Sequence, residues 1–433
     1  MSGIRSNASP TYLDSSKEAT RKRKQLEDLM GLTLKGKPSD NNSMMQHMVP
    51  GVSIAVIHKG KLDFAAAYSQ LEDEPLTLNT LFQAASVSKP VSAMGALRLA
   101  EIGLIRLTDD IRSALKPGTI KFESDELERI IQKIPITLKN LLAHVAGFNG
   151  PGTGFNGYAM GEVYPTVMQI IDGEIPAKNE AIKIVVPPGK ELKYSGGGYT
   201  VMQILLERIY EKNFGKKKSF SDIMKDEVFK KLGMTSSSFN LDELLENKLT
   251  IAKGHDETGA NLIGDHLHYP ELAAAGLWTT PSDLFLYVNE ILSGVYGKKT
   301  KVLSSDMIRE MLTEQLPLNN NGLGLLVRTD ESGKLISFEH PGTNKGFTSD
   351  LFVSPETGYG IIVMTNADNG HSLAEDLMRT VQTIYYTPNI KQVFYSDLSL
   401  FSKLNTHLEG HRHDDPKLQK EYDNRFGLTT YKK

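Results

Sequence analysis

The chain has 433 residues, no cysteine and a formal net charge of −3, with 49 Lys and Arg against 52 Asp and Glu. The absence of cysteine excludes disulfides, thiol nucleophiles and cysteine-ligated metal sites, and the balanced charge argues against nucleic acid as the main partner. The length predicts one large domain with a second lobe, or two closely packed domains.

Residues 1–48 are polar and predict an arm with a short helix around Leu26–Leu34. The basic run Arg21–Lys24 is interpreted as a solvated helix face, because four charges make a weak patch. No apolar run is long enough to span a bilayer, and the first thirty residues lack the apolar core of a signal peptide. We therefore expect a soluble protein, cytoplasmic by default, and periplasmic or secreted if a leader has been lost.

Strand patterns occur at two distant places in the chain. The stretch GVSIAVIHKGKLDFAAAYS, from Gly51, has two apolar runs around His58–Gly60 and predicts a β-hairpin. Further runs lie in LISFEHPGTNKGFTSDLFVSP and GYGIIVMTNAD, after residue 334. Strands on both sides of a helical middle predict an α/β (α+β) fold: an antiparallel sheet flanked by helices, with a helical lobe at roughly 105–270. The domain would span 49–390, followed by a polar tail, 391–433.

The strongest chemical signal is the spacing of Ser86 and Lys89 in FQAASVSKPVSAMGALRLAEIGLIRLTDDI. Three residues apart on a helix, the two side chains share one face. The residues that follow are apolar almost all round, which predicts a buried helix. A buried lysine with a lowered pKa can accept the proton of a serine hydroxyl. Pro90 predicts that Ser86 lies at the N-terminus of this helix, where its N–H can face an oxyanion.

Ser-x-x-Lys alone is a weak pattern, and Ser113 and Lys116 repeat it beside a Pro-Gly turn. We interpret this second copy as exposed and without function. The alternative for Ser86 is a helix cap with a lysine at the surface nearby, which the apolar helix disfavours.

Further motifs accompany Ser86: Tyr194 in VVPPGKELKYSGGGYTVMQILLERI, His340-Pro341-Gly342 in EHPGTNKGFTSDLFVSP, LKNLLAHVAGF around His144, and AAAGLWTTPSDLFLYVNEIL around Trp278. With these motifs, residues from about 45 to 390 resemble the serine β-lactamase and penicillin-binding protein superfamily, in its class C and esterase-like branch. The resemblance does not explain the arm or the tail.

The resemblance implies that Ser86 is acylated and that Lys89 and Tyr194 share the role of general base. For Tyr194 this requires a nearby cation, such as Lys89, to favour the phenolate. His340 would stand where related enzymes keep a lysine, and the N–H of Thr343 would be the second oxyanion donor, with Gly342 leaving room for substrate.

Each of these residues also has an alternative interpretation. Tyr194 could pack over a helix, and His340 could cap a turn. His144 is expected to tie a loop near the site, and Trp278 to be a wall or core residue.

Two departures from the pattern bear on function. Gly196 stands where class C β-lactamases have an asparagine whose amide holds a substrate side chain, and His340 replaces a permanently charged lysine. We expect an esterase, an acyltransferase or a peptidase of D-amino-acid-type substrates in preference to an efficient β-lactamase. If His340 keeps a pKa near ~6.5, binding of a penicillin carboxylate should improve from pH 8 to pH 6.

Other classes of protein fit less well. No serine has the Gly-x-Ser-x-Gly context of an α/β-hydrolase. A cluster in the tail comprises His407, Glu409, His411, His413, Asp414 and Asp415. It lacks the His-Glu-x-x-His pattern, so no metal or other cofactor is expected.

The partner is expected to be a small ester, amide or peptide, and the oligomeric state is left open. A penicillin-binding or cell-wall sensing protein that is acylated without turnover is the alternative.

Overall fold

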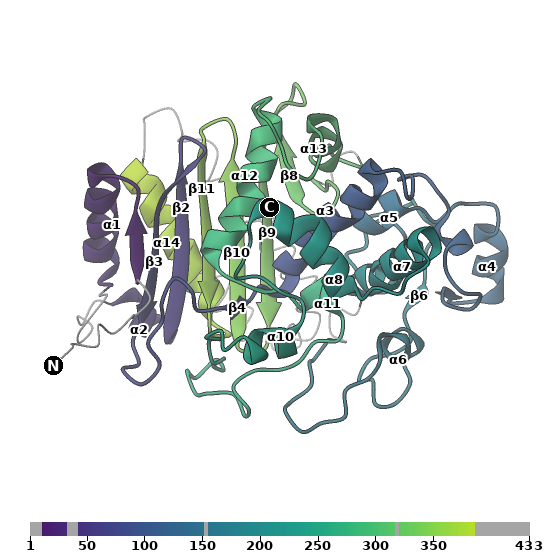
Figure 1. Ribbon diagram of the computed structural model, residues 1–433, viewed down its shortest axis with the longest axis horizontal. Helices are drawn as coiled ribbons and strands as arrows, with labels where there is room; N and C mark the ends of the chain where they lie inside the picture. Colours follow the sequence, from purple (N-terminus) through teal and green to yellow (C-terminus); the bar gives the residue numbers. More distant parts are fainter. Residues whose placement is uncertain (1–10, 33–41, 151–154, 317–319, 386–433) are drawn as a thin grey trace, which may run out of the picture.

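The computed structural model describes residues 11–32, 42–150, 155–316 and 320–385. They are built around a seven-stranded antiparallel sheet with the order β1-β3-β2-β11-β10-β9-β8 (Figure 1). Its strands are β1 (Tyr12–Asp14), β2 (Gly51–His58), β3 (Lys61–Ser69), β8 (Leu326–Thr329), β9 (Leu335–Asn344), β10 (Phe347–Ser354) and β11 (Tyr359–Thr365). β2 pairs with β11, so the two ends of the domain complete one sheet, as the sequence predicts.

The predicted hairpin is formed by β2 and β3. Lys59 and Gly60 connect the strands, and both have positive φ values, 52° and 69°. Two-residue turns with positive φ match the right-handed twist of the paired strands, which explains why the hairpin closes here.

Both faces of the sheet are covered by helices. In β2 alternate side chains enter different cores: Ile54 and Val56 pack with α1 (Lys17–Met30) and α14 (Gly370–Tyr385), while Ala55 and Ile57 join the larger core on the opposite face. The period-two geometry of a strand produces this division. Burial of every residue of β2 except His58 therefore reflects a sheet in the interior of the molecule.

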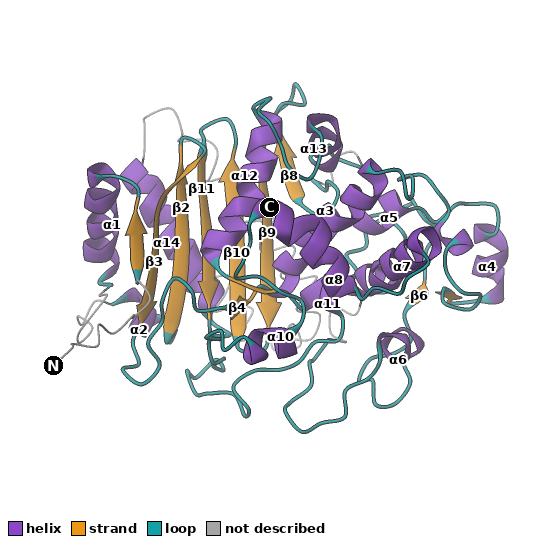
Figure 2. Cartoon of the chain, viewed as in Figure 1, coloured by secondary structure: helices purple, strands orange, loops and turns teal. Residues whose placement is uncertain are grey.

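The middle of the chain is mainly helical and lies beyond the β8 and β9 end of the sheet (Figure 2). Two short strand pairs accompany the helices: β4 (Phe82–Gln83) with β7 (Trp278–Thr279), and β5 (Lys121–Phe122) with β6 (Lys183–Ile184). The remaining helices are α2 (Ser43–Gln46), α3 (Ser88–Glu101), α4 (Asp125–Ile131), α5 (Leu138–Leu142), α6 (Val167–Asp172), α7 (Gly196–Phe214), α8 (Phe220–Met224), α9 (Lys230–Leu232), α10 (Leu241–Glu246), α11 (Leu272–Ala275), α12 (Pro281–Val295) and α13 (Ser305–Met311). A π-helical turn, Lys225–Phe229, joins α8 to α9.

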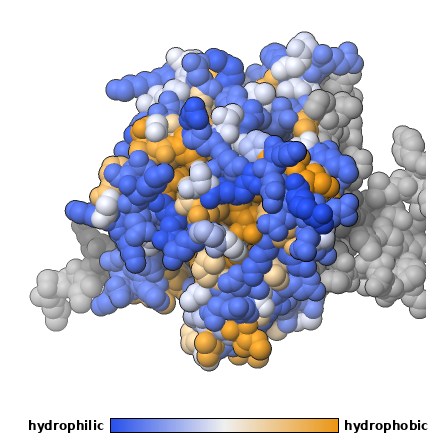
Figure 3. Space-filling model, turned by 90° about the vertical axis from the view of Figure 1, so that its right-hand side faces the viewer, coloured by the Kyte–Doolittle hydropathy of each residue, from blue (hydrophilic) through white to orange (hydrophobic). Residues whose placement is uncertain are grey.

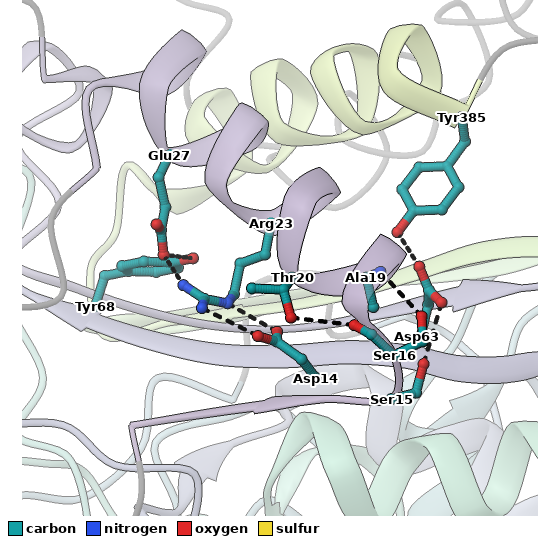
Figure 4. A network of polar contacts seen from close by, with 10 residues as sticks. All are labelled: Asp14, Ser15, Ser16, Ala19, Thr20, Arg23, Glu27, Asp63, Tyr68 and Tyr385. Carbon is teal, nitrogen blue, oxygen red and sulfur yellow. Dashed lines mark hydrogen bonds and ion pairs between the residues drawn. The ribbon is translucent and has the colours of Figure 1, made fainter.

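The interpretation of the basic run Arg21–Lys24 as a solvated helix face is only half right. Arg21 and Lys24 are exposed, but Lys22 and Arg23 are buried, at 6% and 3% exposure. Arg23 Nε donates to Asp14 at 2.8 Å, and its guanidinium also pairs with Glu27 (Figure 4).

Residues 11–32, called the N-terminal segment below, are therefore part of the folded body. Strand β1 pairs with the outer edge of β3, and helix α1, which begins earlier than predicted, packs against α14. On the same face Tyr385 of α14 donates a hydrogen bond to Asp63 of β3 (Figure 4).

The proposed tail and its histidine cluster lie outside the described residues. Among the residues that are described, no group of three or more His, Asp or Glu side chains could hold a metal ion. In the same part of the chain no helix has the length and apolarity needed to cross a membrane.

Candidate active site

Ser86 lies in a tight 3-10 turn, Ala85–Val87, that leads directly into α3. The residue before it, Ala85, has φ 47°, a left-handed conformation that costs energy for a residue with a side chain. Two contacts hold the turn: Ser349 Oγ of β10 donates to Ala84 O at 2.6 Å, and Leu277 N donates to Ser88 Oγ at 3.0 Å. The serine is thus presented at the start of a buried helix, as the sequence predicts.

Lys89 is within reach of Ser86 and is almost fully buried. Its Nζ donates to Ser86 Oγ at 2.9 Å and to Ala274 O of α11 at 2.9 Å. Burial lowers the pKa of Lys89 to about 7, because the low-dielectric interior disfavours the ammonium form. A neutral amine at this place can accept the serine proton.

Tyr194 precedes α7, whose N-cap is Ser195. Its ring lies under the lysine, with Lys89 Nζ 4.9 Å from the ring centroid. The residue is partly exposed, yet its hydroxyl is buried and makes no hydrogen bond of good geometry among the described residues.

The environment of Tyr194 favours the neutral phenol. Burial raises its pKa above the usual value, and the nearby Ser86 hydroxyl opposes this only in part. The expectation that Lys89 would favour a phenolate is therefore not met. A neutral phenol can donate a proton or a hydrogen bond.

His144 supports Tyr194 from the other side. The two rings stack with centroids 4.3 Å apart, and His144 Nδ1 accepts the N–H of Ser195 at 3.0 Å. Burial holds the pKa of His144 well below its usual value. This placement matches the expectation that His144 ties a loop beside the site.

His340 faces the same group from strand β9. Its ring centroid is 6.2 Å from that of Tyr194, and its Nδ1 contacts Pro341 O at 2.6 Å. Burial, with a smaller contribution from Lys89, lowers the pKa of His340 to about 3. The ordinary pKa assumed from the sequence is therefore wrong, because burial removes the solvent that would stabilise the imidazolium.

Gly342 brings β9 into contact with the serine turn. A Cβ at this position would lie 2.6 Å from Ala84 O, 2.9 Å from Ser86 N and 2.5 Å from Ser349 Oγ. The glycine thus makes room for the turn that carries Ser86. β8 pairs with β9 only as far as Glu339, so the serine turn borders the part of β9 that contains Gly342 and Thr343. Thr343 is the next residue of β9 after Gly342, so its N–H lies beside this contact.

The other residues singled out from the sequence lie in distinct places. Gly196 is the first residue of α7, with the ring of Phe155 against it. Trp278 is buried in the core beside Phe347, in agreement with its predicted role. Ser113 is exposed and donates to Asp110 O, so the second Ser-x-x-Lys copy lies on the surface.

Three contributors to the site were not found from the sequence. Ala274 offers only its carbonyl to Lys89, and Ser349 only a hydroxyl to the serine turn. Phe155 lies against Gly196 although 41 positions separate them. None carries a local pattern, because each acts through tertiary contact.

Comparisons with known proteins show the family and the fold of the chain. A model of the β-lactamase family ("Beta-lactamase") matches residues 24–383. Protein flp of Staphylococcus aureus (strain MRSA252) is 24% identical over 336 residues, which cover 74% of this chain and 60% of that protein. The chain therefore aligns with less than two thirds of the length of this curated relative.

Solved structures show the same fold. The octameric penicillin-binding protein homologue from Pyrococcus abyssi has a TM-score of 0.60 and 24% identity, over 78% of this chain and 76% of the other. The structure described as EstCE1, a hydrolase with promiscuous acyltransferase activity, has a TM-score of 0.64 and 16% identity, over 86% of this chain and all of the other. At these identities the likeness establishes the fold alone.

Proposed function

The chain belongs to the β-lactamase family, and on that premise we propose that it is a serine hydrolase that forms an acyl-enzyme on Ser86. The observation that carries the proposal is the 2.9 Å contact between Lys89 Nζ and Ser86 Oγ, made by a lysine whose pKa burial lowers to about 7. A serine hydroxyl becomes an effective nucleophile when an adjacent base takes its proton.

In the proposed acylation, Lys89 accepts the proton of Ser86 Oγ as the oxygen forms a bond to the carbonyl carbon of the substrate. The carbonyl electron pair moves to oxygen, and the N–H groups of Ser86 and Thr343 stabilise the charge that develops there. The intermediate collapses with loss of the alcohol or amine, which takes a proton from the Tyr194 hydroxyl. Lys89 returns its proton to Tyr194. A water molecule then hydrolyses the acyl-enzyme by the same proton transfers in reverse order.

The preferred substrates would be esters or amides without a required anionic group. The buried His340 is neutral at physiological pH because its pKa is about 3, so it supplies no positive charge to a carboxylate. Gly196 supplies no amide for a polar side chain. These features support an esterase, an acyltransferase or a peptidase of D-amino-acid-type substrates over an efficient β-lactamase.

The proposal is tested by labelling with a fluorophosphonate, followed by intact-mass analysis and peptide mapping. We expect one adduct on Ser86, no adduct in Ser86→Ala, and unchanged labelling in Ser113→Ala, which is the matched control for an exposed Ser-x-x-Lys serine. Repeated turnover of a chromogenic ester separates a hydrolase from a non-turnover sensor, which would give a single stoichiometric burst. An adduct on Ser113, or full activity in Ser86→Ala, would refute the mechanism.

A further inference from the structure

The space beside Gly196 is filled by an aromatic ring. A Cβ on Gly196 would lie 2.3 Å from Cε2 and 3.0 Å from Cδ2 of Phe155, so the ring would have to shift to admit it. Gly196 does not have the positive φ that would itself require glycine. A side chain at Gly196, two residues after Tyr194, would therefore require the Phe155 ring to leave the place that it occupies.

The polar groups next to this ring are committed to the protein. Ser195 Oγ accepts from Gly198 N at 3.0 Å and donates to Asn149 O at 2.9 Å, while the Ser195 N–H is bound to His144. The half-buried Phe155 offers neither a hydrogen-bond donor nor an acceptor. The wall of the site on the α7 side is consequently apolar at this point.

Exposed apolar side chains also follow Phe155 in the chain. Large exposed side chains gather in the segment that follows it and in the loop around residue 263; they are Met160 (70% exposed), Val163 (75%), Tyr164 (44%) and Ile263 (90%). The two segments lie together, because Tyr158 and His268 exchange backbone hydrogen bonds and Tyr164 stacks on His268 at 4.4 Å. A Cβ on Gly264 would come within 3.1 Å of Met160 Cβ.

Figure 3 shows several separate apolar patches on the face that carries α4, α6 and α7, one of them at its lower end. Contiguous exposed apolar patches mark binding surfaces more often than chance. We call Phe155, Met160, Val163, Tyr164 and Ile263 the apolar rim.

We propose that the apolar rim binds an extended apolar group of the ester or amide substrate, and that Phe155 sets this preference. The inference rests on the proposed hydrolase function and names its substrate class. Removing methylene groups from water against the ring and the rim stabilises the bound substrate roughly in proportion to the area covered. Glu162, which lies between Met160 and Val163 in the chain, is paired with Lys178 at 2.7 Å, so this lysine leaves no unpaired positive charge here to attract an anionic lipid surface.

The first experiment measures kcat/KM for two series of esters. In one series of p-nitrophenyl esters the acyl group is lengthened from acetyl to octanoyl. In the other series, of matched alkyl esters, the alcohol is lengthened. The wild-type protein should gain about threefold per methylene over the first few carbons in one series, and that series identifies the side that contacts the rim. Phe155→Ala should reduce the gain to below 1.5-fold per methylene, and Phe155→Leu should retain most of it.

Phe214→Ala is the matched control, because Phe214 is an exposed phenylalanine at the opposite end of α7. It should leave the chain-length profile unchanged.

A second pair of variants tests the outer part of the rim. Met160→Ser combined with Ile263→Ser should lower only the gain from the longest chains, and Ile130→Ser on α4 should not lower it. The double variant Phe155→Ala/Gly196→Asn, in which the amide gains the space of the ring, should favour short polar esters over long apolar ones.

Failure of this inference differs from failure of the hydrolase proposal. Suppose that Ser86 is labelled and the acetyl ester is hydrolysed. A flat chain-length profile in both series, or an unchanged slope in Phe155→Ala, then overturns only the proposal that the apolar rim binds substrate. No labelling of Ser86 and no ester cleavage overturns the hydrolase proposal. The protein could instead bind neutral phosphatidylcholine vesicles, lose this binding in Met160→Ser/Ile263→Ser and show a flat chain-length profile. This result would assign the rim to a membrane surface and overturn the substrate assignment.

Discussion

At the scale of single residues, the candidate site combines one group that burial activates with two that burial keeps neutral. Lys89 has its pKa lowered towards physiological pH, so that the amine is available as a base. Tyr194 and His340 are held in their neutral forms by the same desolvation. Because burial always disfavours the charged form, it lowers the pKa of Lys89 and His340 and raises that of Tyr194.

Lys89 and Tyr194 should act as one proton-transfer unit. Lys89→Ala and Tyr194→Phe are each expected to lower kcat by ~10² or more, while the fold survives. The double variant should lose little beyond the more severe single variant, since the two groups serve the same proton. Steady-state kinetics of the three variants, with circular dichroism as the control for folding, checks this; a double loss equal to the product of the single losses would show independent roles.

Ester hydrolysis should exceed penicillin hydrolysis in kcat/KM, because Gly196 and the neutral His340 remove two contacts that a penicillin needs. Since the pKa of His340 is about 3, its charge does not change between pH 6 and pH 8, and it should not improve penicillin acylation over that range. Parallel assays with a short ester and a penicillin at both pH values test this. Rapid penicillin turnover at pH 8 with negligible ester cleavage would contradict it.

At the scale of elements, the site exists because strand β9 and the serine turn approach each other at Gly342. Gly342→Ala should lower the free energy of unfolding by about 1–3 kcal/mol, the usual cost of overpacking, and should also lower kcat because the added methyl displaces Ser86 N. Gly198→Ala is the control: its methyl group would meet neighbours only at 3.6 Å or more, and alanine favours the helix by about 0.5–1 kcal/mol. Equal stability and activity of Gly342→Ala and the wild type would refute this account.

The elements that the sequence predicted are those with strong local patterns. Two short apolar runs on either side of Lys59 and Gly60 predicted β2 and β3, and the apolar sequence after Ser86 predicted the buried helix α3. The carbonyl of Ala274 and the ring of Phe155 could not be predicted, because any residue has a carbonyl and nothing near Phe155 indicates that it meets Gly196. The pKa of His340 was misjudged because burial depends on how distant segments pack.

At the scale of the whole molecule, strands from both ends of the chain form one sheet, and the N-terminal segment closes its outer edge. The sequence-based interpretation missed this closure because Lys22 and Arg23 belong to a charged run, which ordinarily indicates a solvated surface. Their burial is possible because Asp14 and Glu27 neutralise Arg23 while Lys22 lies over the ring of Tyr385.

Arg23→Ala should therefore destabilise the whole molecule. We expect a loss of about 2–3 kcal/mol in the free energy of unfolding, less than the roughly 3–5 kcal/mol typical of a fully buried pair, because the Asp14 and Glu27 side chains are 10% and 15% exposed. Arg21→Ala, which removes an exposed charge of the same run, should change stability by less than about 0.5 kcal/mol. Urea denaturation of both variants measures the difference, and equal effects would show that the N-terminal segment contributes little.

The pH dependence of acylation tests the central claim, that a lysine made neutral by burial activates Ser86. Because the pKa of Lys89 is lowered to about 7, the deprotonated base is lost as pH falls and gained as pH rises. The rate of fluorophosphonate labelling should thus increase from pH 5.5, reach half of its maximum near pH 7 and level off above pH 8. Glu271 is the N-cap of α11, the helix whose Ala274 carbonyl accepts a hydrogen bond from Lys89, and burial raises the pKa of its carboxyl group to about 8. Glu271→Gln removes this second titration and should keep the midpoint near pH 7. A rate independent of pH, or one that still rises steeply above pH 9 as for an ordinary lysine, would contradict the account.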